Sequence, residues 1–509
     1  MLIAPKQNVT FVKMTERDYT GIRQALLTPD GLEQKLYILG GRSIEGVVSA
    51  KVILPADADF AVRTGGFVRM EPQFVIRMLR SFQASDADVL IEWHSHPFTD
   101  RAEFSSIDDR WIGGLVVAAQ RRKPGCLFVR GVMGRSEDGF SLEAWAGDDG
   151  WQCIDEIRVM TSRGTRRIRS WLAPDLATSR PPRESESLYA RTAMVRTPEE
   201  QQRIGDAVVT LIGASGLGFP VAMQLGALGF RHIRLVDGDR IEPCNLNRLT
   251  AASLQDAKQG RLKVHWLADL LRAHDPSSDI VAIPHAFPHA DALAAVATSD
   301  LVICAVDSDK SRDRVLRFAA RHHVPVVDVA VSIYMEMEGT REHERDAHVW
   351  LYISGREVCF RQMGLQGQSL WDDTLIEAQR ASGYVIGDPR ESPGSVQTIN
   401  TLAASLAVSV AEAFLMGRDV PHNMLVIRQT CAPLGVAIRQ LSIAPAPTCL
   451  ICGEDGVEGL GGNPFETQTT IDWALPLPEC PAVLADKADT EPVDAAEALQ
   501  TSGAPADSR

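Results

Sequence analysis

One stretch near the middle of the chain limits its fold more than any other. Residues 208–212 (VVTLI) are an apolar run with the length of a buried strand, residues 213–218 (GASGLG) form a glycine-rich turn, and an apolar helical pattern continues to Gly226. A buried strand, a glycine turn and a helix N-terminus together make a phosphate-binding cradle, because free backbone N–H groups and the helix dipole both favour an anion. With the alternating strand and helix patterns around it, this unit predicts a mostly parallel, doubly wound α/β sheet.

The glycine turn by itself does not decide which nucleotide it holds. Ser215 stands where the usual G-x-G-x-x-G pattern has its middle glycine. Asp237, at the end of the next predicted strand, would bind the ribose of NAD, FAD or ATP alike. The turn residues that we expect to line the site are Gly213, Ser215, Gly216 and Gly218.

The residues after the turn resemble those of a family of adenylating enzymes. Residues 237–248 (DGDRIEPCNLNR) resemble the segment of ThiF, MoeB, HesA and the ubiquitin-activating enzymes that reads Asp-x-Asp and then Asn-Leu-x-Arg. The likeness continues at residues 260–263 (GRLK), two positions later than the family's Gly-x-x-Lys, and at residues 300–307 (DLVICAVD), a strand that ends in aspartate. It spans residues 188–445 and implies a Rossmann-like domain that binds ATP.

A phosphate clamp separates this family from dehydrogenases, which need none. Arg248 and Lys263 can neutralise the phosphates, and Asp307 can hold Mg²⁺ across them. The resemblance implies attack by a protein's C-terminal carboxylate on the α-phosphate of ATP, which gives an acyl-adenylate and pyrophosphate through positioning and charge neutralisation. It also places three more residues in the nucleotide site: Asp237, Asp239 and Asn245.

A short element further upstream points to a second subunit. Tyr189-Ala190-Arg191 resembles the family's Arg-Tyr-x-Arg element, whose last arginine reaches the nucleotide of the partner subunit. Leu188 replaces the first arginine here. By this resemblance Arg191 would serve the partner's nucleotide site, and the protein would be a homodimer through this domain.

A second pattern lies near the N-terminus, in residues 92–97 (EWHSHP) and 104–109 (FSSIDD). His94 and His96 are two positions apart, so on an extended strand both imidazoles project from one face and can reach one ion. A carboxylate shortly downstream can complete three ligands and leave a fourth position open, which is the arrangement of a catalytic zinc. The alternative is that the histidines merely end a buried strand and that the serine–aspartate run only caps the next helix.

These residues resemble the JAMM motif of the JAB/MPN metalloproteases, which cut isopeptide bonds to ubiquitin-like proteins. By that resemblance Glu33 would act as general base and then as general acid, and Ser105 would donate a hydrogen bond to the oxyanion. Asp108 would be the third ligand, one residue later than the family usually shows. Asp109 also fits a Ser-x-x-Asp spacing, but neighbours at a helix start point about 100° apart, so only one of them can face the metal, and we prefer Asp108. Glu92 matches no position of the motif.

Composition excludes several classes of protein. The formal net charge of −14 argues against a nucleic-acid-binding surface. The most apolar stretch, 402–416, carries serine and glutamate and predicts a buried helix rather than a membrane span. The N-terminus lacks the basic and apolar regions of a secretory signal, so we expect a cytoplasmic protein.

Changes in composition divide the chain into segments. Residues 1–162 alternate apolar strands with two helical stretches, around 71–82 and 106–122, and the following Arg-, Pro- and Ser-rich stretch predicts a linker. After about residue 481 large apolar side chains are rare, which predicts disorder. The expected segments are a JAB/MPN zinc metalloprotease domain (1–162), a linker (163–187), a ThiF-type adenylyltransferase domain (188–445), a segment with a Cys-x-x-Cys pair (446–480) and an acidic tail (481–509).

Nine cysteines in a cytosolic chain make a disulfide framework improbable. Cys449 and Cys452 have the spacing of a zinc knuckle, and related adenylating enzymes close such a second, structural zinc site with another Cys-x-x-Cys, which this chain lacks. Cys359 and Cys431 are the nearby thiols that could complete it. Cys359 is alternatively the candidate thioester nucleophile, against an inert buried thiol.

An activating domain fused to a deconjugating one predicts a bifunctional enzyme. It would adenylate the C-terminal glycine of a ubiquitin-like protein and would also process or remove that protein with zinc, with a conjugating enzyme as a further candidate partner. A second hypothesis is activation of a sulfur-carrier protein for cofactor or cysteine synthesis. A third is a scaffold that binds a ubiquitin-like partner without turnover.

Overall fold

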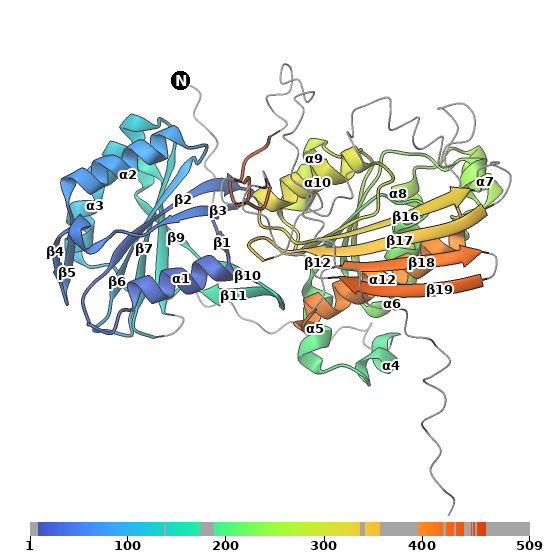
Figure 1. The fold of residues 1–509 in the computed structure, drawn as a ribbon, viewed down its shortest axis with the longest axis horizontal. Coiled ribbons are helices and arrows are strands. Elements are labelled where there is room, and N and C mark those ends of the chain that lie inside the picture. The colour runs from blue at the N-terminus through green and yellow to red at the C-terminus, as the bar shows by residue number, and fades with distance from the viewer. Residues whose placement is uncertain are drawn as a thin grey trace, which may run out of the picture.

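The protein, seen in a computed structural model, has two α/β lobes that lie side by side (Figure 1). Each lobe is built on its own large sheet. The structure describes residues 9–136, 139–173, 188–335, 342–356, 395–420, 424–431, 434–441, 449, 451–453 and 456–464.

A mixed sheet forms the N-terminal lobe. In sheet order its strands are β11 (Gly164–Arg169), β10 (Glu156–Thr161), β1 (Phe11–Thr15), β3 (Gly46–Ile53), β2 (Lys35–Ser43), β6 (Val89–His96), β7 (Leu127–Gly134), β8 (Phe140–Trp145) and β9 (Trp151–Ile154). A separate hairpin pairs β4 (Phe60–Thr64) with β5 (Phe67–Met70). The helices of this lobe are α1 (Glu16–Leu26), α2 (Pro72–Ala84) and α3 (Ser106–Arg122). The two helices expected near 71–82 and 106–122 are thereby confirmed.

The two faces of this sheet bury different helices. Leu36 and Ile38 of β2 pack in the cluster that includes α1, whereas Tyr37 and Leu39 pack against α2 and α3. This alternation is the period of two that a strand buried on both faces requires. On β6, Leu90 faces α2 and α3. Side chains alternate along a strand, so Glu92, His94 and His96 face the same side. The histidine face of β6 is therefore the face that α3 covers.

The C-terminal lobe has a doubly wound sheet with an antiparallel extension. In sheet order its strands are β14 (Asp279–Ile283), β13 (His232–Val236), β12 (Val208–Ile212), β15 (Leu301–Cys304), β16 (Val326–Met335), β17 (Glu342–Tyr352), β18 (Met424–Cys431) and β19 (Leu434–Leu441). The run from β14 to β16 is parallel, as expected. The antiparallel strands β17, β18 and β19 were not predicted.

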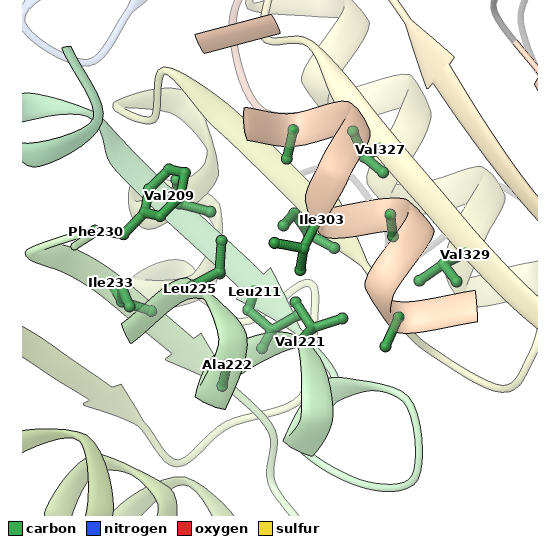
Figure 2. Close-up of a cluster of buried hydrophobic side chains, with 14 of the residues drawn as sticks. Val209, Leu211, Val221, Ala222, Leu225, Phe230, Ile233, Ile303, Val327 and Val329 are labelled. Carbon is green, nitrogen blue, oxygen red and sulfur yellow. The ribbon is translucent and has the colours of Figure 1, made fainter. Parts of the chain in front are cut away.

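Helices cover both faces of this second sheet, as a parallel sheet requires. Val209 and Leu211 of β12 pack in one buried cluster with Leu225 of α6 (Figure 2), and Ile212 packs in the other with α9 and α10. The helices of this lobe are α4 (Ala190–Ala193), α5 (Pro198–Asp206), α6 (Gly218–Leu228), α7 (Leu254–Lys258), α8 (Lys263–His274), α9 (Ala290–Ala297), α10 (Asp309–Arg321) and α12 (Gln397–Met416).

Helix α12 is long and apolar enough to cross a membrane by length and composition alone. Core helices pass the same test, and most of α12 is buried. Ala403, Ala407 and Phe414 pack in the cluster that contains β12 and α6. Helix α12 is therefore a core helix, as predicted for 402–416.

The predicted linker starts too early. Residues Gly164–Arg169 form β11, which pairs antiparallel with β10 and completes the first sheet. Ile168 is buried in the core of that lobe, and Arg167 is ion-paired with Asp300 of the second lobe at 3.1 Å. An arginine-rich composition suggested solvent exposure, but alternate side chains of an edge strand can point to the core while their neighbours carry charge.

A glycine-rich segment, residues 456–464, lies between the two lobes. The Gly461 N–H donates to the carbonyl of Arg321 on α10 at 2.9 Å, and the Gly462 N–H donates to the carbonyl of Arg42 on β2 at 2.7 Å. One segment thus bonds to the backbone of both lobes. The predicted acidic tail, 481–509, lies outside the described residues.

Candidate functional sites

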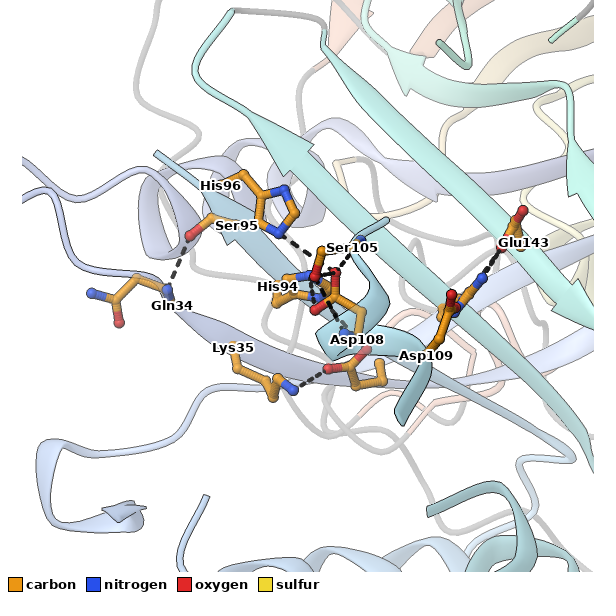
Figure 3. A network of polar contacts seen from close by, with 11 residues as sticks. Gln34, Lys35, His94, Ser95, His96, Ser105, Asp108, Asp109 and Glu143 are labelled. Atoms are coloured by element: carbon orange, nitrogen blue, oxygen red, sulfur yellow. Dashed lines mark hydrogen bonds and ion pairs between the residues drawn. The ribbon is translucent and has the colours of Figure 1, made fainter. Parts of the chain in front are cut away.

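Strand β6 presents the two histidines to a cavity of about 300 Å³. His94 and His96 are buried and line this cavity, while Ser95 between them faces the other way and its hydroxyl accepts a hydrogen bond from the Gln34 N–H at 3.0 Å. That bond ties Gln34, the residue after Glu33, to β6 (Figure 3). The sheet therefore brings Glu33, His94 and His96 to one cavity, although Glu33 is far from the histidines in sequence.

The third predicted ligand comes from the start of α3. Asp108 Oδ1 lies 3.2 Å from His94 Nε2, and Asp108 Oδ2 lies 3.6 Å from His96 Nε2. Ser105 is the N-cap of α3, and its backbone N–H and hydroxyl both donate to Asp108 Oδ2, at 2.7 and 2.8 Å. Ser105 therefore caps α3, as the alternative explanation predicted. The same cap also orients the Asp108 carboxylate towards the histidines.

Asp109 is held elsewhere. Its carboxylate is ion-paired with Arg130 at 2.6 Å, and Arg130 also pairs with Glu143 (Figure 3). The structure therefore places Asp108, and not Asp109, beside the histidines. Ser105 lines the same cavity, but its hydroxyl is engaged with Asp108 and would have to turn to reach an oxyanion.

This cluster fits a zinc ion. Both ring nitrogens of His94 are buried and lack a well-formed hydrogen bond, with carboxylate oxygens of Asp108 and Glu92 3.2 and 3.7 Å away, so a metal ion would satisfy them better. Ligands about 2.0–2.2 Å from a tetrahedral zinc lie roughly 3.4 Å apart, close to the two nitrogen–oxygen distances above. His94, His96 and Asp108 each offer one ligand atom within 4.8 Å of the others. The donor set is the one expected for a three-ligand zinc site.

The charges around His94 favour a cation. Burial opposes protonation of this imidazole, but the carboxylates of Asp108 and Glu92 outweigh it and raise the pKa of His94 to about 9. Glu92 is buried, ion-paired with Lys35 at 2.6 Å, and its other oxygen lies 3.7 Å from His94 Nδ1. Glu92 matches no position of the JAMM motif, so no role was predicted for it. Glu92 lies two residues before His94 on a fully buried strand, so both side chains project from the same face. That spacing could have predicted the contact between Glu92 and His94.

Glu33 has the properties of a general base. Burial raises its pKa to about 7, and the neighbouring His94 lowers it only in part. A carboxyl group poised near neutral pH can both take and return a proton. Glu33 lines the same cavity as His94, His96 and Asp108.

The nucleotide cradle forms where β12 ends. Gly213 adopts φ +93°, and a Cβ there would lie 2.6 Å from the carbonyl oxygen of Ala305, so this turn requires glycine. Gly218 begins α6, where a Cβ would collide with the carbonyl of Gly213. The turn opens on a cavity of about 510 Å³, a volume typical of small-molecule sites. Of the turn residues predicted for this site, the cavity is lined by Gly213, Ser215 and Gly216.

Three further predicted residues form one wall of this cavity. The Asp237 carboxylate accepts hydrogen bonds from the backbone N–H groups of Ala214 and Asp239, both at 2.8 Å. Burial raises the pKa of Asp237. Lys263 is buried, and its ammonium group is ion-paired with Asp239 at 2.8 Å. Lys263 and Asp239 both line the cavity.

Arg248 and Asp307 line the same cavity from other elements. The Arg248 guanidinium donates to the carbonyl of Cys244 at 3.1 Å and to Ser215 Oγ at 3.4 Å. Asn245 is buried and caps a 3₁₀ turn, Pro243–Asn245, that leads to Arg248. Asp307 follows β15 at the carboxyl end of the parallel sheet, where ligands of doubly wound folds bind. The residues predicted for a phosphate clamp are thus gathered in one place.

Several residues that line this cavity had not been predicted. Ser395 and Asn400 come from a distant part of the chain, and Asn400 Nδ2 donates to Ser395 Oγ at 3.0 Å. Arg312 of α10 lines it as well. No short motif marks these residues, because long-range packing brings them to the site. Arg191 lies on α4 and is not among the residues that line the cavity.

The structure does not complete the proposed zinc knuckle within the residues it describes. Cys449 is buried against the core of the second lobe, and its carbonyl accepts a hydrogen bond from the Gly453 N–H at 2.8 Å, a tight turn. Among the described side chains, the groups close enough to share an ion do not include Cys449, Cys452 or Cys431. Cys359 lies outside the described residues, so its predicted roles stay predictions.

The fold and the second site define a mixed α/β protein with a Rossmann-like nucleotide domain. The family model described as ThiF family matches residues 189–449, about half of the chain. The chain therefore belongs to the ThiF family. The matched residues are those of the second lobe.

Two relatives are similar to about half of the chain. The chain is 32% identical over 260 residues to the maize (Zea mays) protein named adenylyltransferase and sulfurtransferase MOCS3-1, which covers 51% of this chain and 49% of that protein. It is 26% identical over 258 residues to the molybdopterin-synthase adenylyltransferase of Escherichia coli K12, and the match covers 50% of this chain and 90% of that protein. The chain spans about half the length of the maize relative. A crystal structure of E. coli MccB with ATP shares 20% identity and a TM-score of 0.41, covering 54% of this chain and 76% of that one.

Proposed function

We propose that the second lobe uses ATP to adenylate the C-terminal glycine carboxylate of a sulfur-carrier or ubiquitin-like protein. The observation that carries this proposal is the gathering of Arg248, Lys263 and Asp307 around a cavity of about 510 Å³ at the glycine turn. Membership of the ThiF family supports it.

In the proposed reaction a carboxylate oxygen of the partner attacks the α-phosphorus of ATP. A new P–O bond forms, the bond to the β-phosphate breaks, and pyrophosphate leaves. Arg248 and Lys263 would hold the phosphates and neutralise their charge, and Asp307 would hold Mg²⁺, which supplies further charge neutralisation when bound. No proton has to move at phosphorus, so positioning accounts for most of the catalysis.

The partner that we propose differs from the one favoured by the sequence. The fused histidine site suggested a conjugation or deconjugation system, whereas the maize relative is named an adenylyltransferase and sulfurtransferase and a Thermus thermophilus relative a sulfur carrier protein adenylyltransferase. These names favour sulfur-carrier activation over conjugation for this chain. We keep a ubiquitin-like modifier as the second candidate.

Thermal unfolding with added nucleotides tests the proposal. Mg²⁺ with ATP should raise the melting temperature, while NAD and FAD should leave it unchanged, because the clamp serves a triphosphate. An Asp307→Ala variant should lose most of the ATP effect. Stabilisation by NAD that survives Asp307→Ala would contradict the proposal and favour an oxidoreductase.

We further propose that the N-terminal lobe is a zinc-dependent isopeptidase that processes or releases the same partner. His94, His96 and Asp108 would hold the ion, and their 3.2 and 3.6 Å separations support this assignment. When bound, zinc would act as a Lewis acid. The Glu33 carboxylate would take the proton of the attacking water and return it to the leaving amine, so that the C–N bond breaks and a carboxylate forms.

Metal analysis of the purified protein tests this second proposal. One zinc per chain should be present, lost with a His94→Ala or His96→Ala change. Zinc that is bound with no cleavage of any Gly-Gly-linked substrate would favour the third hypothesis, a binding scaffold.

A further inference from the structure

A buried ion pair with a histidine beside it lies at the edge of the nucleotide cavity, which Arg312 lines. Arg312 of α10 and Asp328 of β16 are both buried, and Arg312 Nη1 donates to Asp328 Oδ2 at 2.9 Å. His348 of β17 contacts the same oxygen through Nε2 at 3.0 Å. Burial opposes ionisation of Asp328, but Arg312 and His348 outweigh it and hold the pKa of this carboxyl below its usual range.

Arg312 is bonded to the backbone on both sides of Asp307. Its Nη2 donates to the carbonyl of Val306 at 2.5 Å, and its backbone N–H donates to the carbonyl of Ser308 at 3.1 Å. These are the carbonyl groups of the residues immediately before and after Asp307. The Arg312 side chain therefore holds the carbonyl just before the residue expected to hold Mg²⁺, whereas the bond to Ser308 is the first i→i−4 bond of α10, which any residue except proline would make.

Asp307 depends on this backbone support. Its side chain is exposed, and within the described residues its carboxylate makes no hydrogen bond or ion pair. The Arg312 side chain thus holds the connection from β15 to α10 at Val306, and Ser308 is the N-cap of α10.

We propose that Arg312, held by Asp328 and His348, is a positioning residue that fixes Asp307 for Mg²⁺ in the nucleotide cavity. The inference rests on the proposed ATP-dependent function. It assigns the antiparallel strand β17 a role in the site, because His348 supports Asp328 from that strand. A buried ion pair is weak evidence for stability, since apolar residues of similar size are often as stable, so a positional role accounts for its presence at this place.

The test measures ATP affinity by isothermal titration calorimetry, with saturating Mg²⁺ and with EDTA. The metal-dependent gain is the dissociation constant in EDTA divided by the dissociation constant in Mg²⁺. An Asp307→Ala variant gives the value of this gain when the carboxylate expected to hold the metal is lost. In Arg312→Lys and Asp328→Asn the gain should fall by roughly tenfold or more, the size of effect that outer-sphere partners of metal ligands have. Affinity in EDTA should stay close to that of the wild type.

Two further variants separate positioning from folding. Asp313→Asn on the same helix removes one partner of a matched pair, Asp313–Arg317 at 2.8 Å, which does not line the cavity. It should leave the metal-dependent gain unchanged. The double variant Arg312→Met/Asp328→Leu removes the pair without leaving a lone buried charge, so it should fold even if the single variants do not, and it should lose the gain.

An unchanged gain in the folded double variant would overturn the inference. An equal loss of affinity in EDTA and in Mg²⁺ would also overturn it, because Arg312 would then bind the phosphates directly. Absence of ATP binding by the wild-type protein is a different result, since it would overturn the proposed function itself and this inference with it.

Discussion

The Arg130 guanidinium lies 2.6 Å from the Asp109 carboxylate, whereas the neighbouring Asp108 carboxylate lies 3.2 Å from His94 Nε2. Adjacent carboxylates at the start of one helix thus have different partners. Asp109 completes an ion pair, and Asp108 faces the histidines.

This separation predicts opposite effects of two neighbouring substitutions. Asp108→Ala should lower zinc affinity strongly, because one of three ligands is lost. Asp109→Ala should leave zinc bound and cost no more than about 1 kcal/mol of stability, since Asp109 is largely exposed and Arg130 keeps Glu143. Zinc content and chelator competition on the purified variants measure both effects. Zinc lost from Asp109→Ala and retained by Asp108→Ala would reverse the assignment.

Glu33 should be needed for cleavage but not for the metal. Glu33→Gln keeps the size of the side chain and removes the base, so cleavage of a Gly-Gly-linked fusion substrate should fall by about 10²–10⁴-fold with zinc still bound. Glu156→Gln is the control, because Glu156 is paired with Arg158 at 2.6 Å in the same lobe and away from the cavity. Loss of zinc from Glu33→Gln would make Glu33 a structural partner instead.

The junction between the lobes should weaken in acid. His322 Nε2 donates to the carbonyl of Gly462 at 3.0 Å and its Nδ1 accepts from the Ser43 hydroxyl, so it is buried in its neutral form. His323 donates to the carbonyl of Ser49 at 2.6 Å. Burial lowers the pKa of His322 to about 3 and that of His323 to about 4, from 6.5.

The sign of the effect follows from proton uptake. Below pH 6.5 the unfolded chain protonates both histidines and the folded protein does not, so stability falls as pH drops from 6.5 towards 4, by up to about 1.4 kcal/mol per pH unit for each. Melting temperatures of wild type and His322→Gln should therefore converge between pH 7.5 and pH 5. Burial raises the pKa of Glu458 to about 7, so this residue makes the folded protein more stable as the pH falls. Glu458 is present in both proteins, so its effect cancels in the difference between their melting temperatures. A difference that is constant over this range would contradict the prediction.

Much of both sites could be predicted because short motifs carry them. The spacing of His94 and His96 and the glycine turn after β12 each specify local geometry, and the structure gathers most of the expected residues around each, although Gly218 and Arg191 do not line the nucleotide cavity. Arg312, Ser395 and Asn400 could not be predicted, since they reach the nucleotide cavity only through long-range packing.

Strands β17 and β11 were not predicted for a related reason, because pairing with neighbouring strands defines them. An antiparallel strand such as β17 carries no motif and is defined by its neighbours. Strand β11 was assigned to the linker because arginines dominate its composition, although pairing with β10 decides its structure.

The step after adenylation separates the two candidate partners. If a thioester forms, an adduct of enzyme and partner should appear on a non-reducing gel, vanish with reductant and be absent from the relevant cysteine variant, with Cys359→Ser as the first to test. Sulfur-carrier activation by direct transfer predicts no such adduct from any of the nine cysteines. An adduct lost in Cys359→Ser would make this a conjugation-type activating enzyme.

Pyrophosphate exchange into ATP tests the central claim most directly. With a carrier protein ending in Gly-Gly, the wild-type protein should catalyse exchange, Arg248→Ala and Asp307→Ala should each abolish it, and Cys359→Ser should match the wild type, because the carboxylate attacks phosphorus without a thiol. Exchange that persists in both Arg248→Ala and Asp307→Ala would contradict the proposed phosphate clamp, and absence of exchange with every Gly-Gly-ended carrier would contradict adenylation itself.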